Sequence, residues 1–231
     1  MFRRPREGCF HEGGGRGTVL FSSRTHYGAL DPELLSALTQ PDSAMLNPIP
    51  QFDHNLVLPP HIGEPVDPRQ LSPYSCSTLD LCQRFGTSPE RKAILSGYLD
   101  FRERLRAEGL TNGFQWIDGS FLEDVETKEK RSPRDIDVVT VFWGYDLSFQ
   151  QQLSVNFPEV ASPALSKARF SVDHYPVDAG FDPAVTLEST RYWILLFSHS
   201  RMGVWKGMLK IELDTPAEDA AARRELARLM S

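Results

Sequence analysis

Apolar and polar residues alternate regularly only after residue 75, and their spacing there predicts two early helices. Ser77 and Ser88 are N-cap residues by type, and Pro89 takes the first helical position, where proline is favoured. The first helix is predicted to reach about residue 85, and Gly109 stops the second. The second helix therefore buries one stripe of apolar residues, at Ile94, Tyr98, Phe101 and Leu105.

Short runs rich in β-branched and aromatic residues predict strands between further helices. The predicted strands cover residues 114–117, 135–143, 170–177, 192–197 and 208–213. A helix is expected over residues 148–157, and Thr215 with Glu218 forms a capping box that opens a C-terminal helix. The expected fold class is therefore α/β (α+β), with a mixed central sheet flanked by helices.

The N-terminal third of the chain differs in composition from the rest. Residues 1–30 hold five Arg, two Glu and six of the 16 glycines, and we predict a flexible basic arm over residues 1–45. Eight of the 17 prolines lie in residues 41–73, which predicts an extended Pro-rich segment over residues 46–75, draped over the domain surface. Residues 76–231 are expected to form the main domain.

Composition and charge restrict the class of function. The 231 residues carry a net charge of −6, which argues against a surface that coats nucleic acid, although a local basic cleft is compatible with it. No apolar run approaches the roughly 18 residues that cross a bilayer, and the basic N-terminus lacks the apolar core of a secretory signal. Three scattered cysteines, Cys9, Cys76 and Cys82, favour neither a disulfide framework nor a zinc site. We therefore expect a cytoplasmic protein with no membrane partner.

Residue types that bind phosphate and metal lie at the end of one predicted strand and at the start of the next. The first strand ends at Asp118, and Gly119 and Ser120 then make a tight turn. Backbone N–H groups of such a turn bind anions, glycine lets a phosphate approach closely, and serine adds a hydroxyl donor. Asp135 and Asp137 lie two apart on the next strand, so their carboxylates share one face and repel each other unless a cation lies between them. Carboxylate and triphosphate oxygens are the ligands that Mg²⁺ prefers.

The order Gly-Ser, spacer, Asp-hydrophobic-Asp-hydrophobic resembles the nucleotidyltransferase superfamily, which has the DNA polymerase β-like fold. Within it, the chain is similar to an uncharacterised group of bacterial nucleotidyltransferase-like proteins, through residues 116–121, 135–138 and 205–208. The resemblance covers roughly residues 75–213. It implies a central sheet of nucleotidyltransferase type and an NTP held at the Gly-Ser turn. It also implies two Mg²⁺ ions, bound by the two aspartates and by a third carboxylate from a later strand.

Two residues are candidates for that third carboxylate. Asp173 shares a strand face with Tyr175, whereas Asp178 shares the other face with His174. Pro176 cannot donate to a strand ladder and weakens the strand before Asp178. The resemblance also places an acidic residue before a hydrophobic/aromatic-Pro step, which Asp173 matches. We expect Asp173 to complete the set, and Asp178 is the alternative.

Positively charged side chains are needed to complement a triphosphate. The candidates are Lys167, Arg169 and Lys206. Lys206 is favoured because the run Trp-Lys-Gly over residues 205–207 precedes a predicted strand and recurs in the resemblance. His174 faces away from Asp173, so we expect a core or hydrogen-bonded histidine there rather than a ligand.

Two function hypotheses remain open at this point. The first is a Mg²⁺-dependent enzyme that binds an NTP and transfers the NMP to a hydroxyl on a protein, a nucleic acid or a small acceptor. The resemblance implies a role in a toxin–antitoxin or phage-defence module, because small bacterial members of the superfamily often act there. The alternative is a non-catalytic, antitoxin-like partner that keeps the fold and acts by binding a cognate protein, because fold does not determine function.

Overall fold

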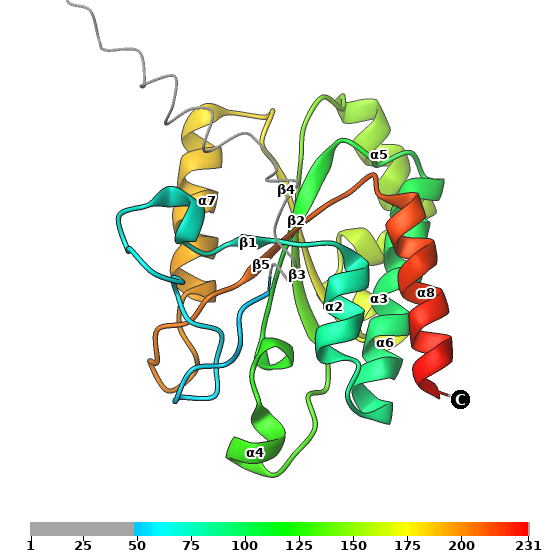
Figure 1. Ribbon diagram of the computed structural model, residues 1–231. Coiled ribbons are helices and arrows are strands. Elements are labelled where there is room, and N and C mark those ends of the chain that lie inside the picture. The colour runs from blue at the N-terminus through cyan, green and yellow to red at the C-terminus, as the bar shows by residue number, and fades with distance from the viewer. Residues whose placement is uncertain (1–48, 231) are drawn as a thin grey trace, which may run out of the picture.

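Five strands form one mixed sheet in the centre of residues 49–230, the part of the chain that the computed structural model describes (Figure 1). The strands are β1 (Tyr74–Ser75), β2 (Gly113–Asp118), β3 (Ile136–Phe142), β4 (Val172–Asp178) and β5 (Leu209–Glu212), in the spatial order β1-β5-β2-β3-β4. β2 runs antiparallel to β3 and β5, whereas β3 pairs with β4, and β1 with β5, in parallel. The predicted α/β (α+β) class with a mixed, helix-flanked sheet is confirmed. The arm predicted over residues 1–45 lies outside the described residues.

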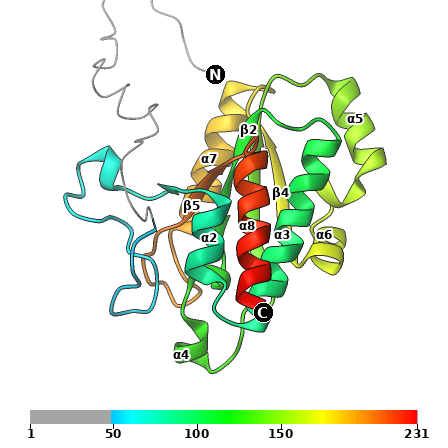
Figure 2. The ribbon, with the colours of Figure 1, turned by 45° about the vertical axis from the view of Figure 1, so that its right-hand side comes forward.

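Helices cover both faces of this sheet (Figure 1 and Figure 2). They are α2 (Thr78–Phe85), α3 (Pro89–Ala107), α4 (Val125–Glu129), α5 (Leu147–Asn156), α6 (Pro163–Phe170), α7 (Pro183–Phe197) and α8 (Pro216–Met230), with 3-10 turns η1 (Pro68–Gln70), η2 (Ser120–Leu122) and η3 (Pro158–Val160). One face carries α2, α3, α6 and α8, and the other carries α7. No helix among residues 49–230 is both long and apolar enough to cross a bilayer.

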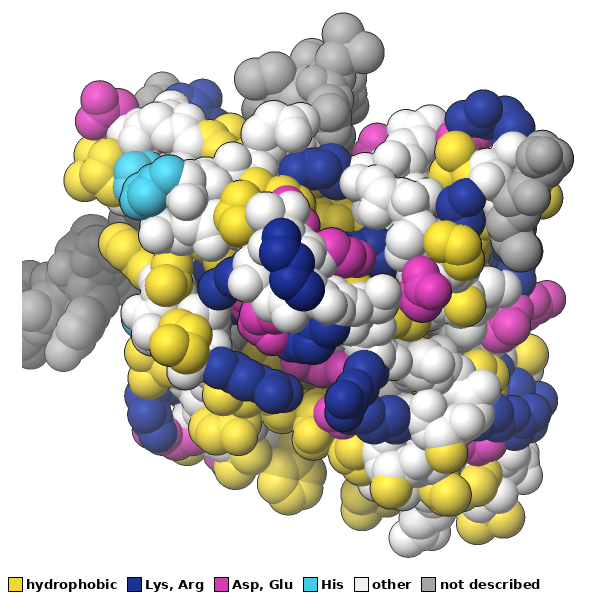
Figure 3. All heavy atoms as spheres, turned by 90° about the horizontal axis from the view of Figure 1, so that it is seen from below, with side chains coloured by type: hydrophobic (Ala, Val, Ile, Leu, Met, Phe, Trp, Pro, Cys, Tyr) yellow, Lys and Arg dark blue, Asp and Glu magenta, His cyan; other side chains and the backbone are white. Residues whose placement is uncertain are grey.

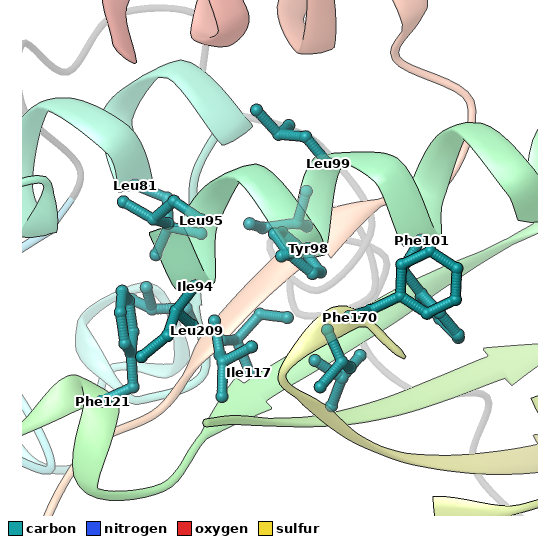
Figure 4. Packing of buried hydrophobic residues seen from close by; sticks show 14 of the residues in the cluster. Leu81, Ile94, Leu95, Tyr98, Leu99, Phe101, Ile117, Phe121, Phe170 and Leu209 are labelled. Carbon is teal, nitrogen blue, oxygen red and sulfur yellow. The ribbon is translucent and has the colours of Figure 1, made fainter. Parts of the chain in front are cut away.

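The larger hydrophobic core lies between the sheet and the helices α2, α3, α6 and α8. The apolar stripe predicted for α3 is buried in it, and Figure 4 shows Tyr98 and Phe101 of this stripe among the buried residues of the sheet and α6. Strand side chains alternate between the faces, so Val138 joins this core, whereas Val139 and Val141 join a smaller cluster under α7. The two faces of the sheet are therefore covered unequally.

The helix starts predicted from serine and proline agree with the structure. Ser77 and Asp80 form a reciprocal capping box at the start of α2, and the Ser88 side chain accepts a hydrogen bond from the Arg91 N–H at the start of α3. Gly109 follows the C-cap residue Glu108 of α3 and adopts a φ of +89°, a conformation that glycine reaches without strain. Local capping chemistry thus sets the helix boundaries that the sequence made visible.

The strand predicted over residues 192–197 is wrong, because these residues form the second half of α7. Asp182 caps this helix by accepting hydrogen bonds from the N–H groups of Ala184 and Val185, and Pro183 takes the first helical position. A short apolar run does not distinguish a strand from a helix by periodicity alone, and the start signal lies ten residues upstream. The sequence prediction also missed α6, so that Phe170, expected in a strand, ends a helix instead.

The Pro-rich segment packs into the body of the protein. Ile49, Leu58 and Tyr74 are buried members of the larger core, and the Tyr74 hydroxyl donates to the Pro59 carbonyl over 2.7 Å. The N–H of Gly207 donates to the Leu58 carbonyl, and a side chain at Gly207 would lie 2.4 Å from the Pro59 oxygen. This segment therefore packs against residues 205–207 and contributes to the core, rather than only lying over the domain surface.

Candidate functional site

Three aspartates lie side by side across neighbouring strands at one end of the sheet. The strand register pairs Asp118 of β2 with Asp137 of β3, and Asp137 with Asp173 of β4. Neighbouring strands are about 4.8 Å apart, so these carboxylates are close neighbours on the face that carries α7. Asp135 lies two residues before Asp137, on the same face. We call Asp118, Asp135, Asp137 and Asp173 the acidic cluster.

The acidic cluster lies at the end of the molecule from which α4 projects. Figure 3 views this end, and acidic side chains gather near its centre with Lys and Arg side chains around them. Gly119 follows Asp118 with a φ of +88°, and a Cβ there would lie 2.6 Å from the Oδ2 atom of Asp137. Only glycine therefore allows the predicted tight turn and the close approach of the Asp137 carboxylate. Ser120 follows as the first residue of η2.

Lys206 is the buried cation behind this turn. Its ammonium donates to Asp118 Oδ1 over 2.8 Å and to the Gly119 carbonyl over 3.3 Å, and lies 3.3 Å from Glu123 Oε1. Its side chain is only 2% exposed, and these three partners match its three N–H donors. Lys206 therefore holds the Gly119–Ser120 turn in place, whereas the sequence prediction made it a phosphate contact.

Arg91 of α3 fixes the segment that follows the turn. Its guanidinium donates to the carbonyls of Phe121 and Glu123 over 2.6 and 2.7 Å, and pairs with Glu126 over 2.6 Å. Buried guanidinium groups are stable when such partners satisfy all of their donors. Two buried cations from distant parts of the chain thus position the loop that begins at Gly119.

Lys167 of α6 reaches the other side of the acidic cluster. Its ammonium lies 2.7 Å from Asp135 Oδ2 and 3.3 Å from Asp173 Oδ2. The Ser171 N–H donates to the Lys167 carbonyl, and the Ile136 N–H donates to the Ser171 carbonyl, so the end of α6 is joined to the start of β3. Lys167 was a candidate for complementing a triphosphate, and α6, the helix that the sequence did not reveal, brings its ammonium to these two carboxylates.

Burial and mutual repulsion perturb the acidic cluster. Desolvation, together with the charges of Asp135 and Asp173, raises the pKa of Asp137 to about 6. Desolvation also raises the pKa of Asp118 to about 7, although the Lys206 ammonium opposes this shift. Burial alone would lower the pKa of Lys206, but Asp118 and Glu123 raise it above its ordinary value. The positive charges near Asp137 therefore do not compensate for its burial and for the negative charges around it, so its ionised form is destabilised.

The pH dependence of stability tests this electrostatic account. Because the pKa of Asp137 is higher in the folded than in the unfolded chain, its ionisation destabilises the fold fully above pH 6, and this cost decreases as the pH falls towards 4. We predict that Asp137→Asn stabilises the metal-free protein by about 1–3 kcal/mol at pH 7.5, and that roughly half of this gain remains at pH 5.

Thermal melting of the two proteins at both pH values measures this difference. Asp118, Asp135, Asp173 and Lys167 are present in both proteins, so the two proteins differ only in the Asp137 carboxylate. A variant that is less stable than the wild type at pH 7.5 would contradict the account.

The acidic cluster is compatible with a divalent cation but is not a preassembled metal site. Among residues 49–230, no three His, Cys, Asp or Glu side chains are grouped in a geometry ready to hold a metal ion. Asp135, Asp137 and Asp173 bring three carboxylates against the one ammonium of Lys167, which leaves an excess of two negative charges when all are ionised. Hard oxygen ligands with excess negative charge suit Mg²⁺, so the donor set fits such an ion.

The structure separates the two candidates for the third carboxylate. Asp173 is the direct neighbour of Asp137, whereas Asp178 pairs with Phe142 at the other end of β4, roughly 16 Å along the strand. Asp178 also accepts hydrogen bonds from Gln150 and from the Gly180 N–H, both over 2.8 Å. The geometry therefore brings Asp173, not Asp178, to Asp135 and Asp137.

Other predicted residues have structural partners elsewhere. His174 is fully buried, and its ring bonds to the Thr140 hydroxyl over 2.7 Å and to the Val160 carbonyl over 2.9 Å. Burial lowers the pKa of His174 to about 3, so the histidine is neutral, and the prediction of a hydrogen-bonded core histidine is confirmed. Arg169 pairs with Glu159 over 2.6 Å and does not join the acidic cluster. Cys82 is buried and free, and burial raises the pKa of its thiol to about 12.

Sequence reasoning assigned no role to Asp118 and Glu123, which hold Lys206. Asp118 directly precedes the Gly-Ser turn, and the antiparallel pairing of the two neighbouring strands would have placed it opposite Asp137. Glu123 carries no comparable sequence signal, because its place depends on the loop that Arg91 fixes.

The family model of DUF6932, described as a family of unknown function, matches residues 50–212. This match covers more than half of the 231 residues, and the chain belongs to that family. The matched region contains the whole acidic cluster together with Lys167 and Lys206. No curated protein and no solved structure matches the chain.

Proposed function

We propose that the chain is a Mg²⁺-dependent nucleotidyltransferase that binds an NTP beside Gly119 and Ser120. The observation that carries the proposal is the convergence of Asp135, Asp137 and Asp173 next to the turn at Gly119, where a Cβ would collide with the Asp137 carboxylate. This arrangement supports the resemblance to the nucleotidyltransferase superfamily that its motifs suggested. A role in a toxin–antitoxin or phage-defence module rests on that resemblance alone.

The proposed reaction is the transfer of a nucleoside monophosphate to a hydroxyl group. The acceptor oxygen forms a bond to the α-phosphorus, the bond between the α-phosphorus and the bridging oxygen breaks, and pyrophosphate leaves while the hydroxyl proton passes to solvent. Asp135, Asp137 and Asp173 would hold the cations, which, when bound, neutralise triphosphate charge and favour ionisation of the acceptor hydroxyl. The turn at Gly119 would position the triphosphate. Because the proposed reaction needs NTP and Mg²⁺, we propose the cytoplasm as its location.

The direct test incubates the full-length protein with each α-³²P-labelled NTP and Mg²⁺, in the presence of candidate protein, RNA and small hydroxyl acceptors. We expect label transfer with release of pyrophosphate, and EDTA should abolish both. The acceptor class follows from the product that carries the label. Absence of transfer to every acceptor, together with absence of nucleotide binding, would contradict the proposal.

Asp173 and Asp178 provide a matched pair of variants for the metal site. We predict that Asp173→Asn weakens Mn²⁺ binding at least about tenfold, because it removes one of three converging carboxylates. Asp178→Asn carries the same change on the same strand and should leave Mn²⁺ binding within about twofold of the wild type. Titration of free Mn²⁺ by electron paramagnetic resonance measures both. Equal effects of the two changes would remove Asp173 from the proposed ligand set.

The alternative function is that of a non-catalytic binding partner with the same fold. One observation favours it: Lys167 and Lys206 already neutralise part of the acidic cluster within the chain. Such a protein would keep the fold, with or without the nucleotide pocket, and would act by binding a cognate protein without transferring a nucleotide. The transfer measurement above distinguishes the two functions.

A further inference from the structure

Two lysines contact the acidic cluster, and they differ in how firmly they are held. Lys206 is 2% exposed, and each of its three donors has a partner. The Lys167 side chain is 48% exposed, and its ammonium contacts two carboxylates, those of Asp135 and Asp173. Moving a buried ammonium away from its carboxylates costs several kcal/mol, whereas a half-exposed one regains water when it moves. Only Lys167 is therefore free to leave the cluster.

The backbone of Lys167 is fixed although its side chain is not. The Phe170 carbonyl packs against Gly97 of α3, where a Cβ would approach it to 2.1 Å, so this helix cannot shift towards α3. The hydrogen bond from Ser171 to the Lys167 carbonyl and that from Ile136 to Ser171 join the same turn to β3. A change at Lys167 is thus a rotation of the side chain about a fixed Cα.

The Lys167 ammonium lies where a cation shared by Asp135 and Asp173 would lie. It contacts both carboxylates at once, over 2.7 and 3.3 Å, and both are also required by the function proposed above. One carboxylate oxygen cannot keep a full contact to the ammonium and to a small divalent ion on the same side, because the two cations repel each other at such distances. Binding of the ion and the Lys167 contacts therefore exclude each other.

We propose that Lys167 is a displaceable counter-ion, which neutralises Asp135 and Asp173 in the metal-free protein, leaves them when a divalent cation binds, and then pairs with the anionic triphosphate. This inference rests on the proposed function and adds a coupling between the metal and the nucleotide. Without a bound cation, the Lys167 ammonium neutralises part of the negative charge of the acidic cluster. It also supplies a positive charge beside the cluster only after the cation has bound.

The proposal predicts effects of opposite sign for one substitution. Lys167→Met keeps the apolar stem but removes the ammonium, so Mn²⁺ alone should bind about three- to tenfold more tightly because it has no competitor. In the presence of saturating Mn²⁺, α,β-methylene-ATP should bind about tenfold more weakly, because one charge-assisted contact to phosphate is lost. A purely structural role of Lys167 would weaken both.

Arg169→Met is the matched control, because it removes one positive charge from the same helix. Arg169 is 60% exposed and pairs with Glu159, outside the acidic cluster. Both Mn²⁺ and nucleotide affinity should stay within about twofold of the wild type in this variant. Electron paramagnetic resonance of free Mn²⁺ and calorimetric titration of the nucleotide provide readouts that do not depend on activity, and melting curves check that each variant folds.

The outcomes separate this inference from the proposed function. If Mn²⁺ binds the wild type, and Asp137→Asn removes that binding, but Lys167→Met does not tighten it, the counter-ion proposal is overturned while the proposed function stands. Tighter Mn²⁺ binding with unchanged nucleotide binding overturns the pairing with triphosphate. If neither the wild type nor Lys167→Met binds Mn²⁺, the proposed function fails and the inference fails with it.

Discussion

Lys206→Met is expected to lower the free energy of unfolding by about 3–5 kcal/mol and the Tm by roughly 10 °C. The change leaves Asp118 and Glu123 in a buried site after the removal of the ammonium that both contact. A buried carboxylate without its partner costs far more than the net contribution of the original pair, because desolvation of the charge is no longer compensated. Chemical denaturation followed by circular dichroism measures this loss.

The control for Lys206→Met is Lys210→Met, at a lysine four residues further along the chain, in β5. Lys210 of β5 is 32% exposed, pairs with Glu212 over 2.7 Å and lies 4.7 Å from the centre of the Phe114 ring. Lys210→Met should therefore change stability by no more than about 1 kcal/mol. Adding Asp118→Asn to Lys206→Met should restore part of the loss, because it removes one unpaired charge. A Lys206→Met protein as stable as the wild type would contradict the role of Lys206 in holding the turn.

Asp137→Asn is expected to lower the proposed nucleotidyl transfer by more than about 100-fold. Residues that hydrogen-bond to metal ligands typically contribute 10- to 100-fold to metal affinity or activity, and a residue that would contact the cation itself should contribute more. Asp137 lies in the middle of the acidic cluster, between Asp118 and Asp173 in the strand register. Its substitution therefore removes the central carboxylate of the proposed metal site. Steady-state rates of pyrophosphate release with the most active NTP measure the effect.

Stability and the proposed activity should change in opposite directions in this variant. Asp137→Asn should be more stable than the wild type without metal, since it removes a carboxylate whose pKa burial and like charges raise to about 6. Asp146→Asn, an exposed change at the N-cap of α5, is a suitable control that keeps a capping side chain and should retain full activity. Retained transfer in Asp137→Asn would mean that the acidic cluster is not where the reaction occurs.

Local signals in the sequence predicted much of the scaffold. The capping residues Ser77 and Ser88 and the apolar stripe of α3 depend on neighbours within a few positions, so they are visible without tertiary information. Alternation along β4 likewise separated Asp173 from His174 and placed them on opposite faces. The Gly-Ser turn and the Asp135 and Asp137 pair at the start of β3 were recognisable for the same reason, since each motif is continuous in the chain.

What the sequence did not reveal depends on contacts between distant segments. The partners of Lys206 lie more than 80 positions away, at Asp118 and Glu123, and only the tertiary structure brings them together. Lys167 contacts Asp135 because the unpredicted α6 packs against Gly97 of α3. The apolar run of α7 was misread because apolar residues also occupy its exposed side, at Tyr192, Leu195 and Leu196, so the run lacks the polar face that marks a surface helix.

The most direct test of the central claim is a crystal structure of the full chain with Mn²⁺ and α,β-methylene-ATP, with the anomalous signal of manganese recorded. We expect an anomalous peak bounded by Asp135, Asp137 and Asp173, the triphosphate beside Gly119 and Ser120, and the Lys167 ammonium turned from the carboxylates towards phosphate. Manganese and nucleotide bound elsewhere, with Lys167 still paired to Asp135 and Asp173, would contradict it.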